Sequence, residues 1–333
     1  MEETKELTLN FEDMWPGFEK ENNYFYRLLS KKYKIVIADN PKILIYGVFG
    51  NAHKRYNCTK VHFISENYRP DFSDCDYAFS FDYPEKNDRN YRLPLYALYF
   101  ELYSNNGQIT LNDLTQPLSD IEAIKILKNK KNFCCMVVSN PSCQLRIDFF
   151  NKLSKYKKVD SGGRVLNNIG GPIKDKLKFL NDYKFVISFE NSSHPGYTTE
   201  KILDGFIGRC IPIYWGNEVV GREFNAQAFI NIHDFDDFSA AIDRIIEIDS
   251  DDDLFLEYIK RPKYINGVEY INTRPSSVLN RFEEIINGTT GPVNRGLIHK
   301  GKLLFWVMQD KKKLIEIARN FNQSFYRFRD LSK

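Results

Sequence analysis

The sequence predicts an α/β protein of two domains, each with a parallel β-sheet covered by helices. The chain has 333 residues, and since domains run to about 100–200 residues, length alone favours two of them. In the second half of the chain, short apolar segments alternate with helical segments, which is typical of parallel strands buried on both faces. A polar stretch between residues 104 and 120 separates the two halves. We therefore expect domains over 1–115 and 116–295, followed by a tail over 296–333.

In the first half, four short apolar segments predict strands because turn residues such as Asn-Pro and Asn-Tyr-Arg-Pro separate them. The expected strands cover 34–38, 43–48, 61–65 and 76–81. An aromatic helix is expected over 95–103, with Pro94 tolerated at its first turn.

In the second half, strands and helices are expected to alternate regularly. The expected strands cover 133–138, 158–160, 185–189 and 210–215, and the expected helices 121–127, 174–180 and 200–207. A further helix is expected to run to about Leu153, with Ser139-Asn140-Pro141 supplying its cap and Pro at its first helical position. This half is therefore expected to be a Rossmann-like nucleotide-binding domain, although it has no G-x-G-x-x-G sequence.

Composition excludes several classes of function. The net charge is only +3, which argues against a dedicated nucleic-acid binder. Six cysteines without a C-x-x-C pair argue against a zinc site and predict thiols buried in the core. We see no apolar leader and no run near the ~18 apolar residues of a membrane helix, so we expect a cytoplasmic protein.

The tail is the exception to this near-neutral balance. Between residues 300 and 333 there are nine Lys or Arg and three Asp or Glu, and aromatic side chains are interleaved among them. Such a basic, aromatic segment fits a helix lying on an anionic membrane surface, here the inner membrane face. It equally fits a C-terminal helix packed against the first domain, and both interpretations stay open.

One segment predicts a binding site for an anion. The expected strand 185–189 is followed by a small polar loop and a helix that begins at Glu200. Ligands of open α/β sheets bind at the carboxyl ends of the strands, and helix N-termini there attract phosphate. Lys201 lies in the first turn, where a cation is unfavourable and an anionic ligand would remove the conflict. The alternative is that Glu200 and Lys201 are a solvated charged pair.

The same segment carries a resemblance to a known family. Residues 189–192 (FENS), 196–204 (GYTTEKILD) and 211–216 (IPIYWG) resemble the donor-site signature of the α1,3/α1,4-fucosyltransferases, and of their bacterial members in particular. The similarity extends to 157–163 and 229–235, and more loosely to 63–67 and 76–78.

The resemblance implies a GT-B fold, in which two Rossmann-like domains face each other across a cleft. The domain over 1–115 would bind the acceptor, the domain over 116–295 would bind GDP-fucose, and the tail over 296–333 would be helical. It implies an inverting transfer of fucose from GDP-fucose, and no obligatory metal, so that a divalent metal would at most be stimulatory. The Asp triplet 251–253 superficially resembles a metal-binding sequence, but we expect it to be a solvated loop or helix start.

The resemblance also assigns candidate residues. Those matching the family's donor contacts are Arg146, Asn191, Tyr197, Glu200 and Lys201. In this assignment Arg146 clamps the diphosphate, because a guanidinium matches phosphate oxygens; the alternative is a surface arginine. The candidate general base is Glu66, which follows the expected strand 61–65 and would emerge at a carboxyl end facing the cleft. Glu85 and Glu101 are the next candidates.

The resemblance also implies the acceptor: an oligosaccharide or lipopolysaccharide with a Galβ1,4GlcNAc or Galβ1,3GlcNAc unit, fucosylated on the 3-OH or 4-OH of GlcNAc. Such a product belongs to the Lewis antigens. Two other functions stay open from the residues alone: a GT-B transferase that uses another nucleotide sugar, and a catalytically silent carbohydrate-binding protein.

Overall fold

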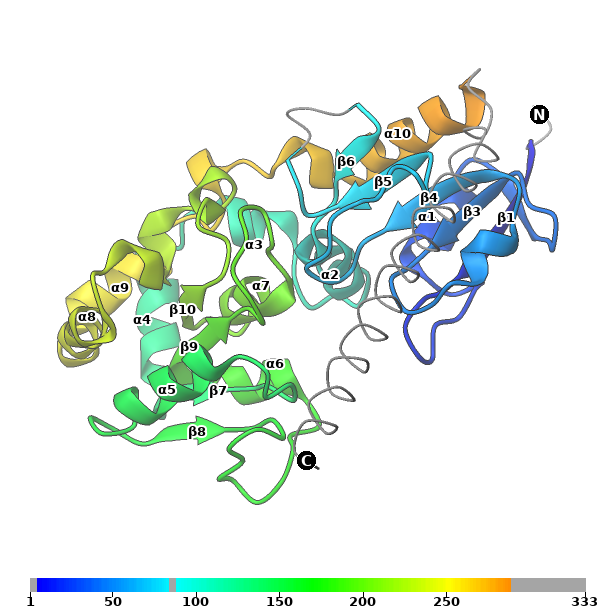
Figure 1. Cartoon of the computed structure of the whole chain (residues 1–333). Coiled ribbons are helices and arrows are strands. Elements are labelled where there is room, and N and C mark those ends of the chain that lie inside the picture. The colour runs from blue at the N-terminus through cyan, green and yellow to red at the C-terminus, as the bar shows by residue number, and fades with distance from the viewer. Residues whose placement is uncertain (1–4, 84–87, 289–333) are drawn as a thin grey trace, which may run out of the picture.

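The computed structural model describes residues 5–83 and 88–288. Figure 1 shows two lobes, each with a twisted sheet and helices packed around it. Both sheets are parallel throughout the described residues. The predicted α/β class is therefore confirmed.

The first lobe contains a six-stranded sheet in the order β2-β1-β3-β4-β5-β6. Its strands are β1 (Glu6–Glu12), β2 (Lys34–Ile37), β3 (Ile43–Tyr46), β4 (Thr59–Phe63), β5 (Tyr77–Ser80) and β6 (Asn90–Arg92). The wholly apolar β3 is buried along its whole length, as expected of a central strand in a sheet covered on both faces.

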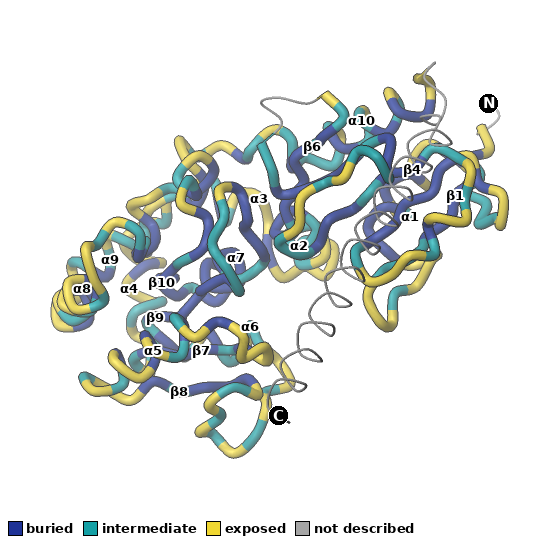
Figure 2. Tube along the Cα trace, viewed as in Figure 1, coloured by how far each residue is buried: buried dark blue, intermediate teal, exposed yellow. Residues whose placement is uncertain are grey.

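The second lobe contains a five-stranded sheet in the order β11-β10-β9-β7-β8. Its strands are β7 (Asn132–Met136), β8 (Val159–Ser161), β9 (Tyr183–Phe189), β10 (Ile211–Trp215) and β11 (Ile230–Asn231). The central strand β9 ends at Phe189, directly before the polar loop that the sequence singled out. Figure 2 shows the strands as mostly buried and the loop tips as exposed.

Ten α-helices cover the two sheets within the described residues. They are α1 (Tyr24–Ser30), α2 (Leu95–Asn105), α3 (Leu111–Thr115), α4 (Asp120–Asn129), α5 (Gln144–Leu153), α6 (Lys176–Leu180), α7 (Glu200–Ile207), α8 (Phe238–Ser250), α9 (Asp252–Lys260) and α10 (Pro275–Asn287). Ser119 and Glu122 form a capping box at the start of α4, which satisfies two otherwise unpaired backbone amides.

Helix α10 returns to the first lobe. The ring of Phe282 stacks on Phe79 of β5 with 4.8 Å between centroids, and lies 5.8 Å from that of Phe25 of α1. The predicted ranges 1–115 and 116–295 do not account for this return, because an amphipathic helical pattern does not tell which sheet the helix will cover. The predicted tail, 296–333, lies outside the described residues.

The two lobes share one hydrophobic core. It combines side chains from the first sheet with side chains of α7 and of the segment after β10. Tyr96 of α2 packs edge-on against Phe224, with 4.9 Å between ring centroids. This continuous packing fixes the two lobes relative to each other and so fixes the site between them.

Most expected elements are present, with shifts of a few residues at their ends, but one predicted start is wrong. Helix α5 begins at Gln144 and not at Pro141. The side chain of Asn140 instead accepts a hydrogen bond from the Ser142 amide at 2.9 Å, which holds these residues in a turn. The expected ranges did not include strands β1, β6 and β11 or helices α1, α3, α8, α9 and α10.

Candidate functional site

The candidate site lies where loops from both lobes meet. On the first lobe, a cleft of about 510 Å³ opens among the loops that follow β1, β3 and β4 and the face of α2. These loops leave the carboxyl ends of their strands, which is the edge where open α/β sheets bind ligands. On the second lobe, the loop 190–199 after β9 and the start of α7 face the same place.

Glu66 is the carboxylate at this meeting point. It follows β4, is half-buried and lines the cleft. Burial raises the pKa of Glu66; the positive charge of Lys201 opposes that rise, and the negative charge of Glu200 adds to it. The Tyr197 side chain also acts to lower this pKa. The fold thus brings the predicted base to the predicted donor residues.

Direct contacts between the lobes hold these two loops together. Asn67, next to Glu66, donates a hydrogen bond to the Ser192 hydroxyl at 2.7 Å. Gly196 lies against the first lobe so closely that a Cβ there would come within 2.4 Å of the Phe81 carbonyl oxygen, and its φ is +96°. Only glycine accommodates both the contact and the backbone angle.

Lys201 lies in a buried cluster with a residue that the sequence reasoning did not assign. Its Nζ atom is 3.1 Å from the Glu190 carboxylate and 2.8 Å from the Thr199 hydroxyl. The fully buried Glu190 also accepts hydrogen bonds from the Thr199 amide at 2.7 Å and the Thr199 hydroxyl at 2.6 Å. Burial alone would lower the pKa of Lys201, but Glu190 and Glu200 raise it, so the amine stays charged.

Glu190 therefore occupies the anion position at the start of α7. An ammonium group has three donors, and the two bonds to Glu190 and Thr199 leave one for a further acceptor. Glu190 was visible in the sequence inside the FENS motif. Its role was missed because nothing local shows that its side chain turns toward residues 199 and 201.

Arg146 is buried and is not the surface arginine of the alternative interpretation. One of its terminal nitrogens donates to the carbonyl oxygens of Phe189 and Glu190, both at 2.8 Å, and to the Asn191 side chain at 3.0 Å. Within the described residues its Nε atom is buried without a hydrogen-bond partner. Burial lowers the pKa of Arg146, against opposing effects of Cys143 and Glu190.

A buried guanidinium with an unused donor is costly unless an acceptor reaches it. The structure places Arg146 against the end of β9, where its bonds shape the loop that carries Asn191. Its positive charge therefore lies directly behind that loop.

Tyr197 and Glu200 complete the predicted set. Tyr197 is buried, and its ring packs edge-on against Phe81 of the first lobe with 4.7 Å between centroids. Burial would raise the pKa of Glu200, but Lys201 and Lys176 lower it, so this carboxylate stays ionised.

Of the two alternative bases, Glu101 is less well placed than Glu66. Glu101 lies on α2 with its carboxylate 3.8 Å from the Lys31 ammonium, and it is not among the residues that line the cleft. Glu85 lies outside the described residues.

The described residues contain no cluster of three or more His, Cys, Asp or Glu side chains that could hold a metal ion. Asp251 caps α9 by accepting hydrogen bonds from the amides of Asp253 and Leu254. The expectation that this Asp triplet is a helix start is confirmed.

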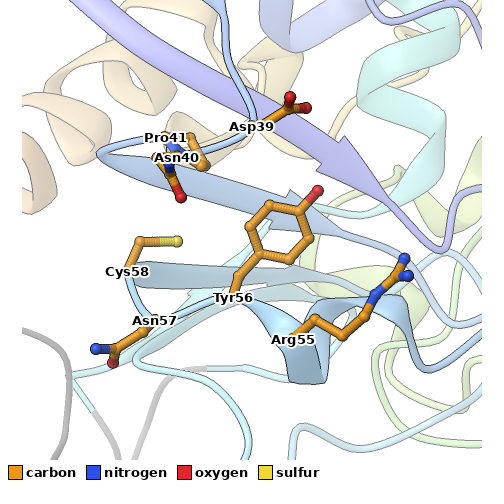
Figure 3. A pocket seen from close by; sticks show the side chains of 7 residues that line it. All are labelled: Asp39, Asn40, Pro41, Arg55, Tyr56, Asn57 and Cys58. Carbon is orange, nitrogen blue, oxygen red and sulfur yellow. The ribbon is translucent and has the colours of Figure 1, made fainter.

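A second hollow, of about 620 Å³, lies away from this site (Figure 3). Its lining residues are Asp39, Asn40, Pro41, Arg55, Tyr56, Asn57 and Cys58. Asn40 and Cys58 come shortly before β3 and β4, so the hollow lies near the amino ends of these strands. It contains none of the predicted residues, and we place the candidate site at the carboxyl ends.

Two family descriptions match this sequence. The "Alpha-(1,3)-fucosyltransferase FucT N-terminal domain" matches residues 9–99, and "Glycosyltransferase family 10 (fucosyltransferase) C-term" matches residues 127–277. Together they cover most of the chain. The first range includes Glu66 and the second includes all five predicted donor residues.

Individual proteins agree with these matches. The chain is 33% identical over 315 residues to the alpha-(1,3)-fucosyltransferase FucT of Helicobacter pylori, covering 83% of this chain and 65% of the relative. The chain thus spans slightly less than two thirds of that relative's length. It is 30% identical over 135 residues to human 4-galactosyl-N-acetylglucosaminide 3-alpha-L-fucosyltransferase 9, covering 39% of this chain and 37% of the relative.

Solved structures show the same fold. A crystal structure of an α1,3-fucosyltransferase with GDP-fucose superimposes with a TM-score of 0.71 at 27% identity, covering 87% of this chain and 93% of that one. A structure of an α1,3-fucosyltransferase with GDP gives a TM-score of 0.70. The expected GT-B fold is confirmed for the described residues.

Proposed function

This chain belongs to glycosyltransferase family 10, the fucosyltransferases, and from this membership we propose that it transfers L-fucose from GDP-β-L-fucose to an oligosaccharide. The single observation that carries the proposal is the contact between the loop of Glu66, on the first lobe, and the loop 190–199 of the second, where Asn67 donates to the Ser192 hydroxyl at 2.7 Å. A two-substrate transfer needs a base on one side of the cleft and a nucleotide site on the other.

The donor is proposed to lie along the loop after β9 and the start of α7. The remaining Lys201 donor can bind the diphosphate, and the guanidinium of Arg146, buried behind the loop, adds positive charge there. Glu200 and Asn191 offer acceptors for sugar or nucleotide hydroxyls, and Tyr197 packs beside them against Phe81 of the first lobe. The relative solved with GDP-fucose supports this donor.

Glu66 is proposed to act as the general base. It takes the proton from the acceptor hydroxyl while that oxygen attacks the anomeric carbon and the bond to GDP breaks. Displacement from the face opposite the GDP inverts the configuration, so a β-linked donor gives an α-fucoside. A positioned base of this kind contributes about 10²–10⁴-fold. The charge that develops on the departing GDP falls beside Lys201 and Arg146, so we propose that no metal is obligatory.

The acceptor is proposed to be a Galβ1,4GlcNAc or Galβ1,3GlcNAc unit on an oligosaccharide or lipopolysaccharide, fucosylated on the 3-OH or 4-OH of GlcNAc. The printed name of the human relative, a galactosyl-N-acetylglucosaminide 3-fucosyltransferase, supports this class. The product would be a Lewis-type antigen.

We also propose that the enzyme works in the cytoplasm, at the inner membrane face, held there by its basic tail. The described residues contain no helix that is both long and apolar enough to span a bilayer. The charge of the tail, nine basic against three acidic residues, supports attraction to anionic lipid.

The deciding experiment is a transfer assay on a glycan array with GDP-fucose as donor, with GDP-mannose and UDP-galactose as comparison donors. Fucosylated Galβ1,4GlcNAc or Galβ1,3GlcNAc is expected with GDP-fucose alone. Transfer from another donor would show that the chain uses a different nucleotide sugar, and sugar binding without any product would show a silent carbohydrate-binding protein.

A further inference from the structure

The cleft that Glu66 lines has an apolar wall that the donor does not explain. Its lining includes three large apolar side chains that are unusually open to solvent: Trp15 is 39% exposed, Phe49 49% and Leu102 42%. Aromatic rings that stay exposed in a concave site are typical of ligand pockets, which combine apolar walls with a few polar groups.

The cleft is continuous with the proposed site of transfer. Glu66 and Tyr99 both line it. On the same helix α2, Tyr103 donates a hydrogen bond to the Asp204 carboxylate of α7 at 2.7 Å, so α2 packs against the donor-side helix. A molecule in the cleft therefore contacts both the base and the apolar wall.

The charges of the cleft favour a neutral occupant. Besides Glu66, the charged residues that line the cleft are Glu19 and Arg27. Both form hydrogen bonds with the Asn22 side chain. Asn22 donates to Glu19 at 3.0 Å and accepts from Arg27 at 3.1 Å. No excess positive charge is left among the lining residues to attract a phosphate or a carboxylate.

Asp13 connects the two loops that carry Trp15 and Phe49. It lies two residues before Trp15, and its carbonyl oxygen accepts a hydrogen bond from the Phe49 amide at 2.9 Å. Its carboxylate accepts from the amides of Ala52 and His53 at 2.8 and 2.9 Å and lies 2.6 Å from the His53 ring. The loop after β3 is thus fastened to the loop after β1.

The loop after β3 packs very closely against Asp13. A Cβ at Gly50 would come within 2.3 Å of the Asp13 carboxylate, and one at Gly47 within 2.5 Å of the Asp13 carbonyl oxygen. Asp13 itself has a φ of +55°, a conformation that Asp tolerates better than most residues. The loop after β3 can approach Asp13 this closely only because glycines face it.

The proposed function already brings the acceptor to this lobe, beside Glu66. We propose that Trp15 and Phe49 bind the apolar ring face of that neutral sugar, and that Asp13 is the positioning residue that sets their placement. The inference rests on the proposed function, because the occupant is taken to be the oligosaccharide whose hydroxyl meets Glu66. It adds the residues that recognise that sugar and the reason they are held in place.

The test measures sugar binding directly, so that it does not depend on transfer. Galβ1,4GlcNAc is titrated into the GDP-loaded full chain by saturation-transfer NMR. Trp15→Ala and Phe49→Ala are each expected to weaken sugar affinity by about tenfold, as the loss of one buried aromatic contact predicts, with GDP affinity unchanged. Ile121→Ala on α4, where the side chain is 81% exposed, is the control and should change neither.

A second pair of variants tests the positioning role. Gly50→Ala pushes against Asp13 without touching the cleft, whereas a Cβ at Gly221 meets nothing within 4 Å. Gly50→Ala is expected to raise the acceptor KM with kcat and GDP affinity retained, and Gly221→Ala to leave all three unchanged. A fold defect would instead lower GDP affinity and the unfolding midpoint together.

Wild-type sugar affinity in both aromatic variants would overturn the proposal, and so would the absence of sugar binding to the wild-type chain. Binding of the same two aromatic variants to phosphatidylserine vesicles is compared with that of the wild type. If the variants lose vesicle binding and keep sugar affinity, the aromatic wall contacts lipid and the proposal is overturned as well. If sugar binds the cleft but no donor is used, the proposed function fails and the role of Trp15 and Phe49 stands.

Discussion

Arg92 and Glu223 form an ion pair between the two lobes in which both side chains are fully buried. Two nitrogens of Arg92 donate to the two carboxylate oxygens, one of them at 2.9 Å, and Tyr96 donates to the same carboxylate at 2.8 Å. Arg92 also donates to the carbonyl oxygen of Gly196 at 3.0 Å, one residue before Tyr197. The pair thus joins the lobes directly behind the donor loop.

Breaking this pair should destabilise the protein strongly. Arg92→Met leaves the Glu223 charge buried and uncompensated, which typically costs about 3–5 kcal/mol. The free energy of unfolding in urea is measured for Arg92→Met, for Glu223→Leu and for the double variant. The double variant is expected to recover much of the loss, because two apolar side chains leave no unpaired charge. Equal and additive losses would contradict this account.

Glu66→Gln should abolish catalysis without affecting the donor. Gln keeps the shape of the side chain and removes its basicity, so transfer is expected to fall at least about a hundredfold, while calorimetric GDP affinity stays near that of the wild type. Glu101→Gln on α2 is the matched control. If Glu66→Gln transfers fucose at a near wild-type rate, another residue is the base.

The pH profile should report the same carboxylate. A base works only when deprotonated, and burial raises the pKa of Glu66 above its usual range. The rate kcat/KM is therefore expected to fall on the acid side at a pH above the ordinary carboxylate range of about 4–4.5. The residual activity of Glu66→Gln should lack this acid limb. An acid limb of unchanged position in that variant would assign it to a different group.

Lys201→Ala should weaken GDP binding by roughly one to two orders of magnitude, since a charge-assisted contact contributes about 1.5–3 kcal/mol. The substitution also leaves Glu190 buried without its cation, so the unfolding midpoint should fall as well. Lys131→Ala, which removes an ammonium that is exposed beside Asp182, is the control. Calorimetry showing unchanged GDP affinity in Lys201→Ala would remove this residue from the donor site.

Removal of residues 296–333 should reduce binding to anionic vesicles and leave GDP binding intact. The reason is the excess of basic residues in that segment, each contributing about 1 kcal/mol near an anionic surface. Co-sedimentation with phosphatidylserine vesicles, at low and at high salt, compares the full chain with the truncated one. Equal partitioning of the two forms would exclude a membrane role for the tail.

The sequence by itself determined the parallel α/β class, the order of most elements and the place of the donor loop. Helix α7 covers residues 200–207, the range that the sequence predicts. This succeeds because the strand, polar loop and helix start are contiguous in the chain, so local periodicity and the FENS–GYTTEKILD motif carry the information. Five of the six cysteines are buried, which composition also predicted.

Only the tertiary structure decided how distant residues pair. It buries Arg146 against the end of β9 and makes Glu190 the partner of Lys201. It returns α10 to the first sheet, and it fastens the loop of Phe49 to Asp13. None of these follows from a local pattern, because the sequence of a helix or loop does not specify which distant surface it will cover. That choice is made by the burial of apolar area and by the need to satisfy buried charges across both lobes.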